Sequence, residues 1–269
     1  MTQTPNPPEY DRTAPYPEID RVPPPPVSPS PGTVLVELPK TRPIVTYTLM
    51  AVTIFIYILQ EAGQVLYGVD WVTGWGLKVN ELILQGQFWR LITPMFLHGS
   101  ILHIAFNMYA LLAIGPGLER YFGHTRFLAL YFISGFAGNV ASFMFSAAPS
   151  LGSSTAIFGL LGAEGVFLYR NQRILGGSAR RALNNIIMIA VINLLIGLSP
   201  GIDNWGHLGG LIGGTIFAWF AGPVLSLEGV YPTMSLVDSR ETREVVLAGL
   251  IDVMIFAFLA FGTIYLRGN

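Results

Sequence analysis

The sequence contains no cysteine and few charged residues, and both shortages restrict what the chain can be. Without cysteine it has neither disulfide bonds nor thiolate metal ligands. Only 12% of the 269 residues are charged, whereas 52% are hydrophobic and the mean hydropathy is +0.53, a composition typical of membrane proteins. The net charge of −1 leaves no basic excess for nucleic acid. We therefore expect a chain embedded in the lipid bilayer, with no nucleic-acid partner.

Proline is concentrated at the N-terminus, where thirteen of the nineteen prolines fall within residues 1–43. Such a segment cannot bury enough apolar surface to order itself, so we predict a disordered, proline-rich tail over residues 1–42. A PxxP ligand for a partner domain is the alternative interpretation. The tail mixes acids with arginines, unlike a transit peptide, and the first apolar stretch starts too late for a signal peptide.

Seven apolar stretches approach the length of about 20 residues that a membrane-spanning helix needs. The predicted spans are 43–60, 100–118, 127–147, 153–169, 182–199, 204–223 and 246–266. Several contain glycine and polar residues, as is typical of helices that pack on one another. The loop at 61–99 carries three tryptophans and an amphipathic stretch, which favour the membrane interface. These patterns predict an all-α membrane protein.

Lysine and arginine predict the orientation, because they gather on the cytoplasmic side of membrane proteins. With the N-terminus inside, twelve of them lie on the inner side and only Lys78, Arg90 and Arg267 on the outer side. We therefore expect a cytoplasmic N-terminus and a C-terminus outside the membrane. The inner set is Arg12, Arg21, Lys40, Arg42, Arg120, Arg126, Arg170, Arg173, Arg180, Arg181, Arg240 and Arg243.

Polar residues recur near the outer ends of the second, fourth and sixth spans. Counted back from its inner end, each of His103, Ser154 and His207 lies 16 residues along its helix, a rise of about 24 Å. Asn107 shares a helix face with His103. Ionisable residues within spans are costly and indicate function. We therefore expect these side chains to lie at one depth, below the outer surface.

A hydroxyl and an imidazole at one depth can perform nucleophilic catalysis. An imidazole can take the proton of Ser154, while His103, Asn107 and backbone N–H groups can stabilise an oxyanion. Taken singly, these residues have simpler interpretations: Ser154 as a helix N-cap, His207 as a packing residue, and His103 with Asn107 as a polar bridge. In "WGHLGGLIGG" glycine recurs every four residues, and a small-residue face on the fourth span would allow close approach of the two helices, although transporters also use such packing.

Four segments resemble a known family. They are "FWRLITPMFLHGSILHIAFNMYAL" with a WR pair and HxxxN, "GPGLERYFG" with GxxxExxxG, "GSSTAIFGLLGA" in the place of GxSG, and "NWGHLGGLIGG" with HxGG. In this order, over about residues 43–223, they resemble the rhomboid family of intramembrane serine proteases. The resemblance implies a six-helix transmembrane bundle, here followed by a seventh helix. The corresponding divisions are the tail 1–42, the core 43–223, and a linker with the last helix over 224–269.

The resemblance also implies roles for individual residues. Ser154 would be the nucleophile and His207 the general base, in a dyad without an acid. The oxyanion hole would consist of His103, Asn107 and the Ser154 amide. Supporting positions near the dyad and structural positions further away complete the set: Gly152, Phe158, Trp89, Arg90, Glu119, Gly209 and Gly210. His98 matches a loop histidine without a catalytic role.

One residue departs from the family pattern, since GxSG requires glycine where this chain has Thr155. We expect Thr155 to narrow the pocket for the substrate side chain or to shift its preference. Asp203 precedes the base by four residues, but we expect it to be a helix N-cap. Asp252 lies beyond the resemblance and receives no role. Glu164 lies about 15 Å deeper than Ser154 by helix rise, out of catalytic reach.

Together these features predict a serine endopeptidase that cleaves transmembrane helices of single-span or multi-span membrane proteins near the outer face of the membrane. The resemblance implies substrates with small and helix-weakening residues near the cut, and it calls for no metal or organic cofactor. Six spans plus a C-terminal seventh suit a bacterial plasma-membrane rhomboid. The alternatives are a rhomboid-like protein that binds membrane proteins without cutting them, which would be expected to lose Ser154 or His207, and a small-solute transporter, which would predict inverted repeats.

Overall fold

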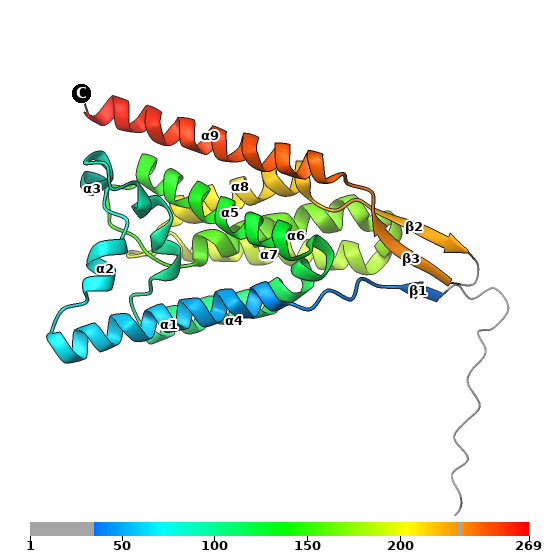
Figure 1. Ribbon diagram of the computed structural model, residues 1–269, viewed down its shortest axis with the longest axis horizontal. Helices are drawn as coiled ribbons and strands as arrows, with labels where there is room; N and C mark the ends of the chain where they lie inside the picture. Colours follow the sequence, from blue (N-terminus) through cyan, green and yellow to red (C-terminus); the bar gives the residue numbers. More distant parts are fainter. Residues whose placement is uncertain (1–34, 231–232, 269) are drawn as a thin grey trace, which may run out of the picture.

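The structure is a computed structural model that describes residues 35–230 and 233–268, and its long helices lie side by side in one bundle (Figure 1). A helix is found at each predicted span, and the largest difference in an end is at the first, which ends at residue 67 instead of 60. The fold class is confirmed as an all-α membrane protein. The long helices are α1 (Ile44–Tyr67), α4 (Ile101–Phe122), α5 (His124–Phe145), α6 (Ser154–Leu175), α7 (Gly177–Ile196), α8 (Asn204–Ala221) and α9 (Thr242–Gly268).

Five of these helices, α1, α4, α5, α7 and α9, are long and apolar enough to cross a membrane. The other two, α6 and α8, carry polar residues and glycines that lower their hydropathy, and at least half of the residues in each are buried among the neighbouring helices. Interior helices need less apolar surface because they face protein rather than lipid. Seven crossings, the orientation and a bacterial plasma membrane therefore stay predictions.

The loop between α1 and α4 is compact and covers one end of the bundle, at the left in Figure 1. It contains α2 (Trp71–Gly76), α3 (Asn80–Leu84) and two 3-10 turns, η1 (Phe88–Leu91) and η2 (Thr93–Phe96). The Arg90 guanidinium holds it together by donating to the carbonyls of Leu77 at 2.6 Å and Gly74 at 2.9 Å. Trp89 stacks on Trp75 with ring centroids 5.6 Å apart.

All three cations at this end of the bundle are bound to backbone carbonyls. Lys78 is fully buried, and its ammonium donates to the carbonyls of Ala148 at 2.8 Å and Ser146 at 3.1 Å. Arg267 of α9 donates to Phe143 and Met144 at 2.9 and 2.7 Å. Both side chains therefore cap the C-terminal end of α5, where cations are favourable. These contacts explain why basic residues occur at the end of the bundle that is otherwise poor in them.

Three helices, α5, α6 and α8, form the centre of the bundle. Glycines allow their backbones to approach closely: a Cβ on Gly210 would overlap the carbonyl of Thr155, and a Cβ on Gly214 would overlap the backbone of Gly159. On the other side of α8, a Cβ on Gly209 would overlap the Cβ of Ala141 in α5. The repeated glycines of "WGHLGGLIGG" therefore serve the close packing that their spacing predicts.

A three-stranded sheet lies at the opposite end of the bundle and was not predicted. It consists of β1 (Leu35–Glu37), β2 (Leu225–Val230) and β3 (Thr233–Asp238) in the order β1-β3-β2, with β1 parallel to β3 and β2 antiparallel to it. Asp238 anchors the sheet by accepting from Arg126 of α5 at 2.7 Å and from the Val224 amide at 3.0 Å.

The sheet corrects the predicted disordered tail at its last residues, because 35–37 form β1 by hydrogen bonding to β3. Composition could not reveal this pairing, since the partner strand lies about 200 residues away in the sequence. It also replaces much of the predicted linker at 224–245 with ordered strands. Residues 38–42 of the predicted tail are in neither a helix nor a strand, and residues 1–34 lie outside the described residues.

Glu119 connects α4 to the start of α1. Its buried carboxylate accepts from the amides of Val45 and Thr46 at 2.8 Å each and from the Thr46 hydroxyl at 2.7 Å. His124 Nδ1 lies 2.6 Å from the same carboxylate. The first amides of a helix have no partner within it, so the carboxylate supplies an N-terminal cap from another helix. The GxxxExxxG segment thus links two helices at the sheet end.

Candidate active site

The N-termini of α6 and α8 lie at the loop end of the bundle and carry the predicted dyad. Ser154 is the first residue of α6, so the simpler interpretation of this serine as the N-cap is wrong. Asp203 is the N-cap of α8, and its Oδ1 accepts from the Gly206 amide at 3.0 Å. Because α6 and α8 pack closely through their glycines, the two helix ends come side by side.

The structure brings Ser154 and His207 into hydrogen-bond contact, with Oγ 2.9 Å from Nε2. The imidazole lies flat on the ring of Phe158, one turn along α6, with centroids 4.3 Å apart and planes 13° from parallel. His207 is 9% exposed, so its surroundings leave it little freedom to turn. In this arrangement a hydroxyl proton can pass directly to the imidazole.

His103 and Asn107 of α4 face the same site. The His103 ring lies against Gly152, where a Cβ would stand 2.8 Å from the ring atoms Cε1 and Nε2. Gly152 also has φ of +129°, which L side chains rarely adopt, so both space and backbone require glycine here. Asn107 donates one N–H to the His103 carbonyl at 3.0 Å. Since an amide carries two N–H groups, the second can bind another acceptor.

These residues enclose a polar cavity of about 250 Å³ next to the Ser154 hydroxyl. A second cavity of about 490 Å³ adjoins it, with six residues lining both. Loop residues between α1 and α4 and between α5 and α6 line the second cavity, which places it at the loop end. The shared residues are His103, Ser150, Leu151, Gly201, Ile202 and Asp203.

His98 contacts the site, although the sequence offered no role for it. It is 2% exposed, its Nε2 lies 3.3 Å from the hydroxyl of Ser153, and its ring packs edge-on against His103 at 5.0 Å. Burial, together with the neighbouring His103, lowers the pKa of His98 to about 3. The imidazole is therefore neutral and supports the loop beside the site. The sequence signal for this position was the resemblance, which matched His98 to a loop histidine without predicting its contact with His103.

Thr155 fills a notch between two neighbouring helices. A Cβ on Gly138 of α5 would lie 2.6 Å from the Thr155 Cβ, and a Cβ on Gly206 of α8 would lie 3.0 Å from its methyl. Thr155 also lines the polar cavity, and its Oγ1 is buried with no hydrogen-bond partner among the described residues. The side chain that replaces the motif glycine is thus accommodated by glycines opposite it. Its effect on substrate preference stays a prediction.

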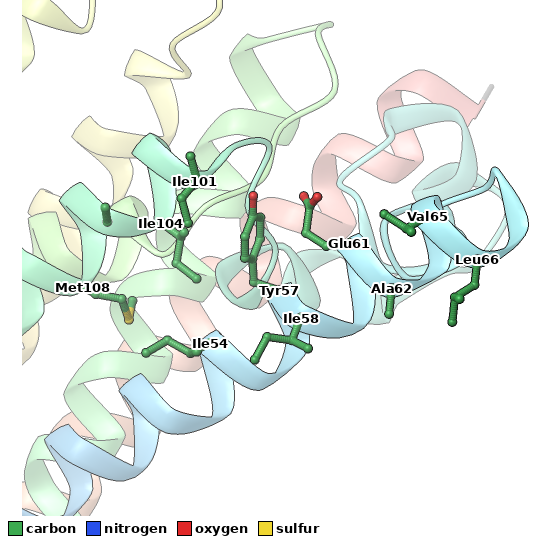
Figure 2. Close-up of a pocket in the computed structure, with 11 residues that line it drawn as sticks. Ile54, Tyr57, Ile58, Glu61, Ala62, Val65, Leu66, Ile101, Ile104 and Met108 are labelled. Atoms are coloured by element: carbon green, nitrogen blue, oxygen red, sulfur yellow. The ribbon is translucent and has the colours of Figure 1, made fainter.

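Two further acids lie outside the site. Glu164 and Asp252 do not line the polar cavity, and Asp252 is buried in α9 with no partner for its oxygens among the described residues. A larger groove of about 750 Å³ lies between α1 and α4. Figure 2 shows Tyr57 and Glu61 as the polar side chains of this groove, among apolar ones. With no nucleophile beside an imidazole, this groove is not the candidate site.

Comparison with known proteins identifies the family of the chain. The family model of the rhomboid domain matches residues 85–224, which include Ser154, His207, His103 and Asn107. The chain belongs to the rhomboid family. The match covers the helices α4 to α8 and the last part of the loop before them, so the rhomboid domain of this protein contains the whole polar cavity.

Individual relatives are bacterial and plant rhomboids. The chain is 42% identical over 187 residues to rhomboid protease GluP of Bacillus subtilis (strain 168). The aligned region covers 69% of this chain and 36% of GluP. It is 38% identical over 154 residues to RHOMBOID-like protein 9, chloroplastic, of Arabidopsis thaliana (57% of this chain, 36% of that protein), and 40% identical over 159 residues to RHOMBOID-like protein 5 of the same plant (58% and 50%). The matches thus span about a third to a half of these relatives.

Proposed function

We propose that this rhomboid is an intramembrane serine endopeptidase in which Ser154 is the nucleophile and His207 the general base. The observation that carries the proposal is the 2.9 Å contact between Ser154 Oγ and His207 Nε2, with the imidazole stacked on Phe158. A serine hydroxyl is a weak nucleophile until a neighbouring base accepts its proton. Similarity to rhomboid protease GluP supports the same activity at the level of the family.

In the proposed reaction, Ser154 Oγ attacks the carbonyl carbon of the scissile peptide bond while its proton passes to His207 Nε2. The C–N bond then breaks as His207 gives this proton to the leaving amine, and an acyl-enzyme remains on Ser154. A water molecule gives a proton to His207 and attacks the ester, and the proton returns to Ser154. The adjoining cavities at the loop end offer water a polar route to the ester.

Negative charge on the carbonyl oxygen would be stabilised by three donors near the cavity. They are a ring N–H of His103, the free N–H of Asn107 and the Ser154 amide at the start of α6. The positive end of the α6 dipole favours an anion at the same place. Removing one such donor typically lowers kcat by about 10²- to 10³-fold.

The substrate would be a transmembrane helix of another membrane protein, cut near the loop end of the bundle. Its carbonyls are engaged in its own hydrogen bonds, so the segment must unwind before attack, and helix-weakening residues would ease this step. The preference for a small side chain next to the cut comes from the family resemblance, and the cavity of about 250 Å³ beside Ser154 has room for such a side chain.

Cleavage of a single-span model substrate by purified full-length protein tests the proposal. Ser154→Ala and His207→Ala should abolish cleavage, and Ser154→Ala should also abolish labelling by a serine-directed fluorophosphonate. Ser153→Ala is the matched control, because the neighbouring serine contacts His98 and not His207, and it should keep the label. Cleavage by Ser154→Ala at the rate of the unmodified protein would refute the dyad. Tight substrate binding without cleavage by the unmodified protein would favour a non-proteolytic rhomboid-like function instead.

We also propose that the loop end faces the outside of a bacterial cell and the sheet end the cytoplasm. With this orientation, twelve lysines and arginines lie on the cytoplasmic side and three on the outer side, as is typical of membrane proteins. Because the chain has no cysteine, single introduced cysteines can report it. Gly74→Cys, in the exposed loop, should react with a membrane-impermeant maleimide in intact cells. Ser178→Cys, exposed at the sheet end, should react only after permeabilisation, and the reverse pattern would overturn the orientation.

A further inference from the structure

A second groove, separate from the polar cavity, lies between α6, α7 and α8. It has a volume of about 450 Å³ and walls that are almost entirely apolar, with glycines on α6 that leave room between the helices. Only Ala179 and Ala190 of α7 are buried, so this helix leaves most of its surface to the surroundings. An apolar groove on a membrane-spanning helix is open to lipid, not to water. Its lining includes Gly165, Tyr169, Leu183, Ile186, Leu211 and Trp219.

At the sheet end of this groove the lining changes from aliphatic to aromatic, with basic residues beside it. Tyr169 and Trp219 stack with ring centroids 6.2 Å apart. The Arg170 guanidinium lies 4.9 Å from the Trp219 ring and donates to its carbonyl. Tryptophan and tyrosine beside arginine are typical of the depth at which lipid headgroups begin. The groove therefore runs from the hydrocarbon region to the headgroup region.

By helical periodicity, the faces of α6 and α7 that line the groove each continue to an arginine. Arg173 lies four residues after Tyr169 on α6, and Arg180 lies three residues before Leu183 on α7, so each continues the stripe that lines the groove. Both side chains are exposed, and in the part of the chain that the structure describes neither has a hydrogen-bond or ion-pair partner. Arg181, one residue further along, is turned by about 100° away from this stripe.

The segment that joins α6 to α7 at this end of the groove carries charge of one sign. Residues 170–181 contain four arginines and no acid. The N-terminus of α7 at Gly177 adds the positive end of a helix dipole. Two unpaired guanidinium groups at the mouth of an apolar groove match the chemistry of an amphiphile with an anionic head and an apolar chain.

We propose that this site binds an anionic phospholipid, with one acyl chain in the groove between α6, α7 and α8 and the phosphate between Arg173 and Arg180. The apolar walls select a lipid over free phosphate, because inorganic phosphate gains nothing from the groove. The arginines select an anionic headgroup over a zwitterionic one, and each should account for about a fivefold preference. This binding is independent of the proposed proteolysis.

Native mass spectrometry of the delipidated full-length protein, with phosphatidylglycerol or phosphatidylcholine of equal chain length added back, tests the proposal. The unmodified protein should retain one phosphatidylglycerol in preference to phosphatidylcholine. Arg173→Gln and Arg180→Gln should each reduce that preference about fivefold, whereas Arg181→Gln, with the same change in net charge, should keep it. Excess inorganic phosphate should not displace the lipid.

A variant of the groove gives an independent readout that leaves the arginines intact. A Cβ on Gly165 would make only ordinary contacts, 3.8 Å from Ile186 and Leu183, so Gly165→Leu should fill the groove without disturbing the helices. It should lower retention of both lipids, whereas the arginine variants lower only that of phosphatidylglycerol. Equal retention of the two lipids by the unmodified protein, an equal loss in Arg181→Gln, displacement by phosphate, or undiminished retention in Gly165→Leu would each overturn the proposal.

Discussion

Phe158 and His207 stack almost in parallel, 4.3 Å apart, although they belong to different helices and are separated by 49 positions in the sequence. The phenyl ring covers one face of the imidazole, while Ser154 Oγ lies 2.9 Å from its Nε2. The stacking on Phe158 sets the plane of the imidazole, and the hydrogen bond with Ser154 sets its rotation within that plane. Phe158 is therefore proposed as a positioning residue for the base.

Replacing Phe158 with leucine keeps a buried apolar side chain but removes the flat surface beneath the imidazole. We expect kcat to fall about tenfold with little change in KM, because the misorientation affects proton transfer and not substrate binding. Cleavage kinetics on a model substrate measure both parameters. Phe158→Tyr keeps the ring and should retain kcat. An unchanged kcat in Phe158→Leu would show that the stacking has no part in orienting the base.

At position 155, the structure predicts that the methyl group matters more than the hydroxyl. Thr155→Val keeps the branched shape in the notch between Gly138 and Gly206 and removes an oxygen that has no partner among the described residues. It should leave the melting temperature unchanged or higher. Thr155→Gly, which restores the family pattern, should lower the free energy of unfolding by about 1–3 kcal/mol because it empties the notch. Equal stability of the glycine and valine variants would contradict this packing role.

Glu119→Ala should destabilise the protein by removing the cap of α1. The amides of Val45 and Thr46 and the Thr46 hydroxyl would lose their acceptor. Unpaired buried donors cost about 1–3 kcal/mol each, so a large fall in melting temperature is expected in detergent. Glu119→Gln retains one acceptor oxygen, so its melting temperature should lie between those of the unmodified protein and Glu119→Ala. Glu81→Ala, on an exposed position of α3, is the matched control and should have little effect.

Lys78 should make the stability of the protein depend on alkaline pH. Burial lowers the pKa of Lys78 to about 8 from 10.5, so between these values the unfolded chain binds more protons than the folded one. The free energy of unfolding contributed by this group is therefore constant below pH 8 and rises with pH between 8 and 10.5. Melting temperatures at pH 7.5, 9 and 10 measure the rise against Lys78→Met, which should lack it. Parallel curves for the two proteins would contradict the shifted pKa.

Much of this architecture can be predicted from sequence because hydropathy and helix period are local properties. Helices occur at the seven predicted places, and the equal distances of His103, Ser154 and His207 from the ends of their helices anticipated that they would share one level. The glycine spacing in α8 predicted close packing, because only small residues allow helix backbones to approach. For these features the information lies within single helices.

Other features depend on partners that no local pattern specifies. The pairing of β1 with β3, the caps that Lys78 and Arg267 place on α5, and the notch around Thr155 all join segments far apart in the chain. In each case many chemically similar groups could have served as the partner. The Lys78 ammonium, for example, could have bound the carbonyls at the end of any helix. Only the packing of the whole bundle makes that choice, because distance and burial decide which polar groups can find one another.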